Sequence, residues 1–265
     1  MANAARKRSI LGESDEWIVQ AGVEGLLNYS EIWVLQEVEF NKELNRWVPL
    51  IHFAVQSPNQ HKILKVWEKE SPGATADMSH EHRPFTMSVT DAQDREVASF
   101  YRPYKAQTSW LTHYAEDDPD YHWHLDVNYP PDNCVGIVGQ IGSIMRQSQK
   151  AFVLMDKDAK GRLFVKGPLR ESRWFAEDIE FNLYSDRHHK RQVGKIVRKF
   201  ESLRKEKLNA QTFQLKIPDN ATVEDRLLII GAALLIEFVC YMTDEKAERR
   251  SSIGKHSVEY PHKIF

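Results

Sequence analysis

The sequence predicts a mainly β fold, in which a closed antiparallel barrel of about twelve strands surrounds one apolar C-terminal α-helix. Short runs rich in β-branched and aromatic residues recur between turn-forming residues from position 32 to position 218, which is typical of a barrel or sandwich. Residues 227–242 (LLIIGAALLIEFVCYM) then form a run with a single charge, Glu237. A helix that is apolar on all sides is buried in a protein or spans a bilayer. A barrel closed around this helix buries both elements at once.

The composition is that of a soluble globular protein, with 265 residues, of which 42% are hydrophobic and 28% charged. A net charge of -2 gives no overall attraction to nucleic acid or anionic membrane, so any such surface must be local. Two cysteines cannot form a disulfide framework, and we expect a reduced, cytoplasm-facing setting. We expect a flexible arm at residues 1–19, a barrel domain at 20–243 and a polar tail at 244–265.

In the first half of the chain, strands are expected at residues 32–40, 47–56, 62–68, 85–90 and 96–101, with turns at 57–60 and 91–94. The segment FTMSVT alternates most clearly. Phe85, Met87 and Val89 should face the helix. Thr86, Ser88 and Thr90 should face the other way. Residues 103–133 contain prolines and aspartates with few strand signals, and we expect a long loop there.

The strand pattern resumes in the second half, at residues 135–145, 151–156, 162–167, 179–185, 192–200 and 212–218. Residues 157–161 indicate a hairpin with a glycine at its close. In the last strand, Phe213, Leu215 and Ile217 share one face and should also point to the helix.

The C-terminal helix is expected from about residue 223 to about residue 243. Thr222 is a suitable N-cap, and Asp225 completes a capping-box pattern. The apolar run is shorter than the roughly 20 residues that cross a bilayer, and it holds an acid. We therefore expect a buried helix, and insertion of Glu237 into a membrane is the alternative. The residues that characterise this central helix are Leu227, Ile230, Gly231, Leu234, Glu237 and Phe238.

Several runs occur in an order that is itself informative. They are RPFTMSVTDAQDREVASFYRPYK (83–105), VGQIGSIMRQSQKAFVLMDKDAKGRLFVKGP (138–168), DIEFNLYS (178–185), VGKIVRKF (193–200) and IGAALLIEF in the final helix. Together they resemble the phospholipid scramblase family over roughly residues 20–243. The resemblance implies the tubby-like fold, a twelve-stranded barrel around a central apolar helix. It also implies calcium-stimulated, ATP-independent movement of phospholipids between membrane leaflets in both directions.

The sequence departs from the family pattern at two places. The cysteine-rich, palmitoylated region of plasma-membrane members corresponds to YKAQTSWLTHYAEDDPDYHWH, which has no cysteine. The family's calcium loop begins Asp-x-Asp, and the matching residues here are amides. By resemblance, the calcium set is Asn209, Gln211, Phe213, Asp219 and Asn220. Because calcium sites gain affinity from carboxylates, we expect calcium to bind no tighter than about millimolar.

A dense basic cluster lies between residues 187 and 207. Its first six members are Arg187, Lys190, Arg191, Lys195, Arg198 and Lys199. Each basic residue near an anionic bilayer contributes about 1 kcal/mol, so several on one exposed face would hold the domain to a membrane. The segment also resembles a family stretch that acts as an unconventional nuclear import signal, which makes import factors a further expected partner. The alternative is a solvated hairpin, and no specific nucleic-acid binding is indicated.

Two functions from different classes stay open. The resemblance implies a phospholipid scramblase, associated with the cytoplasmic side of the plasma membrane. The other function is a membrane-lipid-binding adaptor or nuclear regulator that has the same fold and no transport activity. An enzyme is not expected, because the sequence has no nucleophile elbow, P-loop or dinucleotide fingerprint. The pairs His80/His82 and His122/His124 would each share a face in an extended chain, but no CxxC or HExxH motif supports a metal site.

Overall fold

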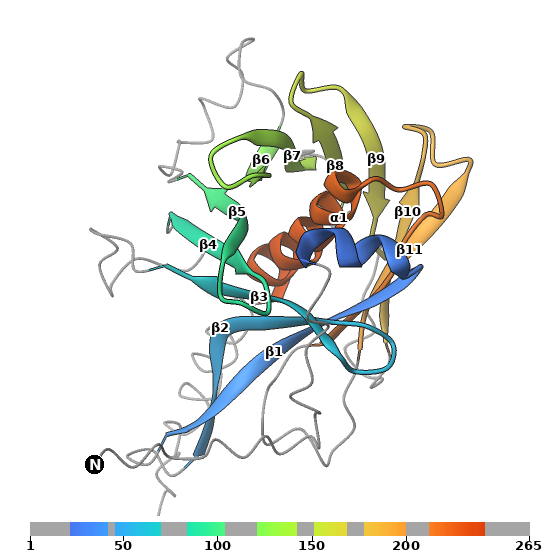
Figure 1. The fold of residues 1–265 in the computed structure, drawn as a ribbon. Helices are drawn as coiled ribbons and strands as arrows, with labels where there is room; N and C mark the ends of the chain where they lie inside the picture. The colour runs from blue at the N-terminus through green and yellow to red at the C-terminus, as the bar shows by residue number, and fades with distance from the viewer. Residues whose placement is uncertain are drawn as a thin grey trace, which may run out of the picture.

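The computed structural model describes residues 22–41, 46–69, 84–103, 121–141, 151–168, 178–199 and 212–241. Within them, twelve antiparallel strands form one closed barrel around a helix (Figure 1). Each strand pairs with its neighbours in the sequence, and β1 closes the barrel by pairing with β12. The barrel with a buried helix that the sequence predicts is confirmed. The predicted arm at 1–19 and tail at 244–265 lie outside the described residues.

The strands follow the predicted order closely. They are β1 (Glu31–Asn41), β2 (Arg46–Gln56), β3 (Lys62–Glu68), β4 (Phe85–Thr90), β5 (Glu96–Arg102), β6 (Tyr121–Asn128), β7 (Cys134–Ile141), β8 (Ala151–Asp156), β9 (Gly161–Lys166), β10 (Ile179–Tyr184), β11 (Gln192–Arg198) and β12 (Thr212–Lys216). Most inward side chains are apolar and fully buried, and they form one continuous core with the helix.

Strand β4 shows how the alternation works and where it misleads. Phe85, Met87 and Val89 are each at most 3% exposed and belong to the core, as predicted. Ser88 and Thr90 lie on the opposite side of the strand and yet are only 1% and 5% exposed. Their small side chains sit between neighbours on β3 and β5, which cover them. The predicted alternation of the two faces therefore holds, but the face opposite the helix is also largely buried at these two residues.

Strand β6 corrects the prediction of a long loop at residues 103–133. Leu125 and Val127 are fully buried, and the half-buried His124 and Asp126 alternate with them on the outer side. This is a regular strand pattern with only two apolar residues in the described part of its inner face. The polar residues around it conceal that short alternation in the sequence.

The two ends of the barrel differ in their connections. At one end, which we call the short-turn end, tight turns join successive strands at residues 57–61, 91–95, 129–133, 156–160 and 185–191. The strand-to-strand connections at the opposite end fall outside the described residues. Four of the tight turns contain a residue with positive φ, namely Gln60, Asp94, Ala159 and His189. In the β8–β9 hairpin, Gly161 begins β9 and closes the hairpin as predicted, and the residue in the left-handed region is Ala159.

The helix enters the barrel from the short-turn end. It begins as α1 (Val223–Ile236) and continues as a π-helical turn, η3 (Glu237–Tyr241). Every residue of α1 from Asp225 onward is buried. Two glycines allow the close approach of helix and wall. A Cβ on Gly231 would meet Leu125 and Val127 at 3.3–3.4 Å, and one on Gly136 of β7 would come within 2.2 Å of the Met155 carbonyl oxygen on β8 and 3.1 Å of Leu228.

A short 3-10 helix, η1 (Gly22–Asn28), covers the start of α1. Val23 and Leu26 bury their side chains, and the segment contacts α1, β3 and β5 (Figure 1). This element was not predicted from the sequence. Its effect is to close the short-turn end over the first turn of the central helix.

Candidate functional site

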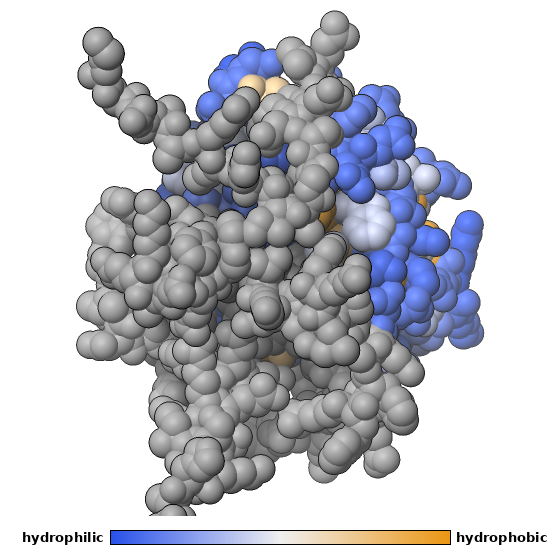
Figure 2. Space-filling model, turned by 90° about the horizontal axis from the view of Figure 1, so that it is seen from below, coloured by the Kyte–Doolittle hydropathy of each residue, from blue (hydrophilic) through white to orange (hydrophobic). Residues whose placement is uncertain are grey.

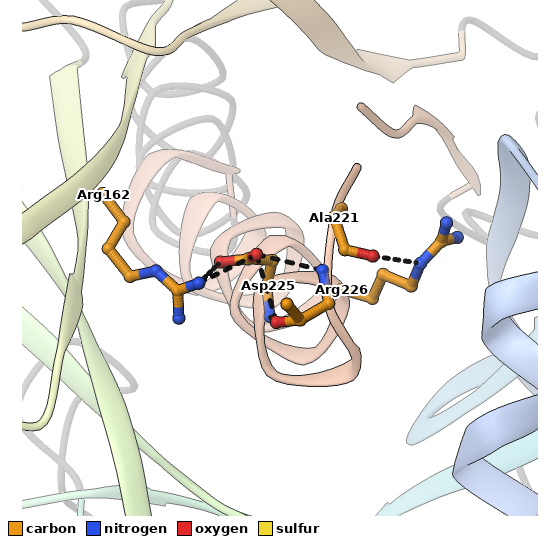
Figure 3. A network of polar contacts seen from close by, with 5 residues as sticks. Arg162, Ala221, Asp225 and Arg226 are labelled. Atoms are coloured by element: carbon orange, nitrogen blue, oxygen red, sulfur yellow. Dashed lines mark hydrogen bonds and ion pairs between the residues drawn. The ribbon is translucent and has the colours of Figure 1, made fainter. Parts of the chain in front are cut away.

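The first turn of α1 carries a network of charged groups. Thr222 caps the helix, and its side chain and that of Asp225 form both bonds of the predicted capping box. The Asp225 carboxylate also accepts a bond from Nη2 of Arg162 on β9, at 3.0 Å (Figure 3). The capping pattern was predicted and is confirmed. The Arg162 contact joins residues 63 positions apart and had no signal in the sequence.

Arg226, the next residue, ties the helix to the opposite side of the barrel opening. Its Nε donates to the carbonyl oxygen of Ala221 at 3.3 Å (Figure 3). Its Nη1 donates to the carbonyl oxygen of Leu26 at 2.7 Å and to that of Tyr29. Burial lowers the pKa of the Arg226 guanidinium, and the neighbouring Asp225 opposes that shift. The charged first turn therefore holds η1 and the barrel wall together.

The far end of the helix is also held by a buried charge. Glu237, at the start of the π-helical turn, accepts a bond from Nε of Arg198 on β11 at 3.2 Å. The Glu237 side chain is 3% exposed and that of Arg198 is 19% exposed. Next to it, the ring of Phe238 lies 4.6 Å from that of Phe85 and 6.5 Å from that of Phe53. The six central-helix residues named from the sequence, Leu227, Ile230, Gly231, Leu234, Glu237 and Phe238, are all buried.

This pairing corrects the prediction for Arg198. Arg198 was expected to lie on an exposed face of the basic cluster, but its side chain points inward to Glu237. The reason is strand alternation: Arg198 lies two positions after Ile196, which is a core residue. Lys195 and Lys199 lie on the outer side of β11, where they pair with Glu180 and with Asp178 at 2.7 Å.

The other three predicted cations, Arg187, Lys190 and Arg191, occupy the β10–β11 turn and are exposed. The Asp186 carboxylate organises this turn by accepting backbone N–H bonds from Arg191, Lys190 and His188 at 2.8–3.2 Å. These bonds, that from Arg191 above all, lower the pKa of Asp186. Seen from below, the described surface on the side of β9–β11 is mostly hydrophilic (Figure 2). The cations after residue 199 lie outside the described residues.

The calcium set implied by resemblance is only partly described. Phe213 is fully buried in the core, whereas Asp219 and Asn220 are exposed in the turn between β12 and α1. Asn209 and Gln211 precede β12 and lie outside the described residues. Phe213 is therefore not brought together with Asp219 and Asn220, because it lies near the start of β12 and their turn follows the end of that strand.

The histidine pairs give no metal cluster either. Within the described residues, no group of three or more His, Cys, Asp or Glu side chains is placed to hold a metal ion. Burial raises the pKa of the Asp126 carboxyl, and the nearby His124 opposes that shift. His80 and His82 fall outside the described residues, as does the side chain of His122.

An open groove of about 590 Å³ runs along the outer wall near β4, β5 and the β6–β7 turn. Its polar groups largely bond one another. Lys69 pairs with Glu96 at 2.6 Å, and Asn128 donates to the Ser99 hydroxyl, which donates to the Pro131 carbonyl.

Comparison with known proteins relates the whole fold to one family. The family model named Scramblase matches residues 15–243. Phospholipid scramblase 4 of Mus musculus is 23% identical over 221 residues, which cover 83% of this chain and 64% of the mouse protein. Phospholipid scramblase 1 of Rattus norvegicus is 24% identical over 233 residues, covering 88% of this chain and 66% of the rat protein. The chain thus spans about two thirds of the length of these relatives.

A solved structure of a protein from Arabidopsis thaliana was also found. It is 13% identical, covers 76% of this chain and 90% of that chain, and has a TM-score of 0.34. Among the described residues, no helix has the length and apolar character needed to cross a membrane.

Proposed function

Because this chain belongs to the scramblase family, we propose that it moves phospholipids between membrane leaflets in both directions without ATP. The observation that carries the proposal is the family match, which spans the complete barrel and its central helix. The two relatives described above are named phospholipid scramblases. We propose the cytoplasmic side of the plasma membrane as the place of action, anionic phospholipid membranes as the partner, and import factors and the nucleus as a second setting.

A dithionite assay tests this function directly. The protein is reconstituted into vesicles that contain a fluorescent phospholipid in both leaflets, and dithionite then destroys the probe that it can reach. A scramblase delivers inner-leaflet probe to the outside, so the fluorescence that survives in protein-free vesicles should be lost without ATP. Survival of that fluorescence at every protein-to-lipid ratio would rule out the proposed transport.

The attachment of the helix supports a second function, a membrane-lipid-binding adaptor or nuclear regulator without transport. Asp225 and Arg226 fix the first turn, and Glu237 fixes the last, so the helix is bound to the barrel at both ends. A protein that keeps this helix inside needs another route to act on lipids, and binding at the surface suffices for an adaptor. In the dithionite assay, this function predicts vesicle binding without loss of the protected fluorescence.

Calcium control is proposed to be weak, because the two leading positions of the family's calcium loop are the neutral Asn209 and Gln211. Isothermal titration should show no calcium binding tighter than about millimolar. Replacing both amides, as Asn209→Asp and Gln211→Asp, should strengthen binding because carboxylates supply the charge that calcium requires. Tight, micromolar-range binding by the unaltered chain would contradict the prediction and indicate a different site.

A further inference from the structure

Two hairpins lie next to each other at the short-turn end. Strands β8 and β9 form one, and β10 and β11 form the other. They are neighbours because β9 pairs with β10, with Tyr184 opposite Phe164 and Asn182 opposite Lys166. Figure 1 shows both hairpins on the yellow-to-orange side of the barrel. Their turns, residues 156–160 and 185–191, are therefore brought to one edge although about thirty positions separate them in the sequence.

Both turns use an aspartate to organise the backbone and leave cations outside. Asp156 accepts N–H bonds from Asp158 and Lys160 at 2.9–3.0 Å, as Asp186 does in its own turn. The exposed cations of the two turns are Lys157, Lys160, Arg187, Lys190 and Arg191. Within the part of the chain that the structure describes, none of these five forms an ion pair. Asp158 is the one exposed acid in the two turns themselves.

Aromatic rings lie on the outer wall where the two hairpins meet, because Phe164 of β9 is opposite Tyr184 of β10. Phe164 and Tyr184 are half-buried on the outer side, and the Phe164 ring lies so close to Gly161 that a Cβ there would come within 2.9 Å of it. The Tyr184 ring meets His189 edge-on at 4.9 Å. Burial and then the positive charge of Lys166 lower the pKa of His189. Aromatic rings that carry a polar group, as Tyr184 and His189 do, are favoured at the boundary between water and lipid.

The other described cations of the basic cluster are paired with acids. Lys195, Arg198 and Lys199 each have a carboxylate partner on the barrel. We propose that the two turns and the rings between them, which we call the hairpin-tip surface, dock the protein on anionic phospholipid bilayers. The inference rests on the proposed function for its choice of partner. It also orients the barrel, because the β8–β11 side of the short-turn end then meets the membrane.

Flotation with liposomes tests the hairpin-tip surface. One variant carries Lys157→Glu and Lys160→Glu, and a second carries Arg187→Glu and Lys190→Glu. A control carries Lys65→Glu on β3, where the residue is half-buried and lies about half the barrel away, and it is compared with the single tip variant Lys160→Glu, which makes the same change in net charge. Thermal melting of the tip variants should stay close to that of the unaltered protein, because the tip residues are exposed.

The unaltered chain should float with phosphatidylcholine vesicles only when they contain phosphatidylserine. Each basic residue near such a surface contributes about fivefold, the equivalent of about 1 kcal/mol, so each double tip variant should bind at least roughly 30-fold more weakly. The control should change far less. Raising the salt from 0.1 M to 1 M shortens the Debye length from about 10 Å to about 3 Å and should release the protein.

Several outcomes would overturn the docking surface. They are unreduced flotation of the Lys157→Glu and Lys160→Glu protein, an equal loss in the β3 control, and flotation with neutral vesicles at 1 M salt. Binding of single-stranded RNA that both double tip variants lose, with flotation unchanged, would assign the surface to nucleic acid. Failure of the dithionite assay alone would leave this surface standing and remove only the transport function.

Discussion

Met87→Asp should prevent the protein from folding. Met87 is fully buried on β4, opposite Phe100 of β5 and within the core around the helix. The core cluster around it is apolar, and the buried Arg102, its diagonal neighbour on β5, already lies over the Phe85 ring at 5.5 Å. An unpaired buried charge costs several kcal/mol, and the cavity left by the lost thioether adds to this. Because domains are stable by only about 5–15 kcal/mol, the variant should be insoluble or melt without cooperativity.

Two matched variants test whether the loss of folding comes from the buried site at Met87 rather than from any substitution in β4. Thr86→Asp puts the same charge one residue earlier, on the outer side of β4 where Thr86 is half-buried. Its thermal melting should stay cooperative. Met87→Leu conserves volume and should cost less than about 1.5 kcal/mol. A soluble Met87→Asp protein with a cooperative melt would contradict the inward register of β4 and, with it, the packing of the barrel on the helix.

Local patterns in the sequence predicted most of the fold because they report on neighbours along the chain. The alternation of Phe85, Met87 and Val89 gave the inner face of β4. The spacing of Thr222 and Asp225 gave the start of the helix. Strand β6 was missed because its short apolar alternation is surrounded by polar residues. The left-handed turn residues, such as Ala159, have no signal in the sequence, because glycine and asparagine are the usual residues in that conformation.

The candidate site was harder to predict because its contacts join distant segments. Glu237 was conspicuous as the lone acid of an apolar helix, but its partner Arg198 lies 39 positions earlier. Counting Arg198 with the exposed cations ignored the alternation that turns it inward. Similarly, Lys157 and Lys160 belong to the hairpin-tip surface only because β9 pairs with β10. Charge density along the sequence identified a basic segment. The fold determines which of its cations pair with acids of the barrel and which are left to contact an anionic membrane.

The contact between Arg198 and Glu237 also bears on how the helix is retained. The helix core is apolar, so its packing does not distinguish a barrel interior from hydrocarbon. The charged groups do distinguish them, because leaving the barrel strips Glu237 of its cation and exposes it to lipid. Removing the partner from one end should therefore both destabilise the barrel and weaken the preference of the helix for its interior.

Arg198→Glu should lower the stability of the fold more than any exposed charge reversal on the same strand. It places a second carboxylate beside Glu237, whose side chain is 3% exposed. Breaking a buried pair costs about 3–5 kcal/mol, which for a domain of this size lowers the melting temperature by roughly 6–20 °C.

Lys195→Glu is the matched control, because its partner Glu180 is 49% exposed and such pairs contribute at most about 1 kcal/mol. Replacing both Arg198 and Glu237 with Met should restore most of the stability, since an apolar pair needs no partner. A fall in melting temperature for Arg198→Glu no larger than that for Lys195→Glu would show that this pair does not hold the helix.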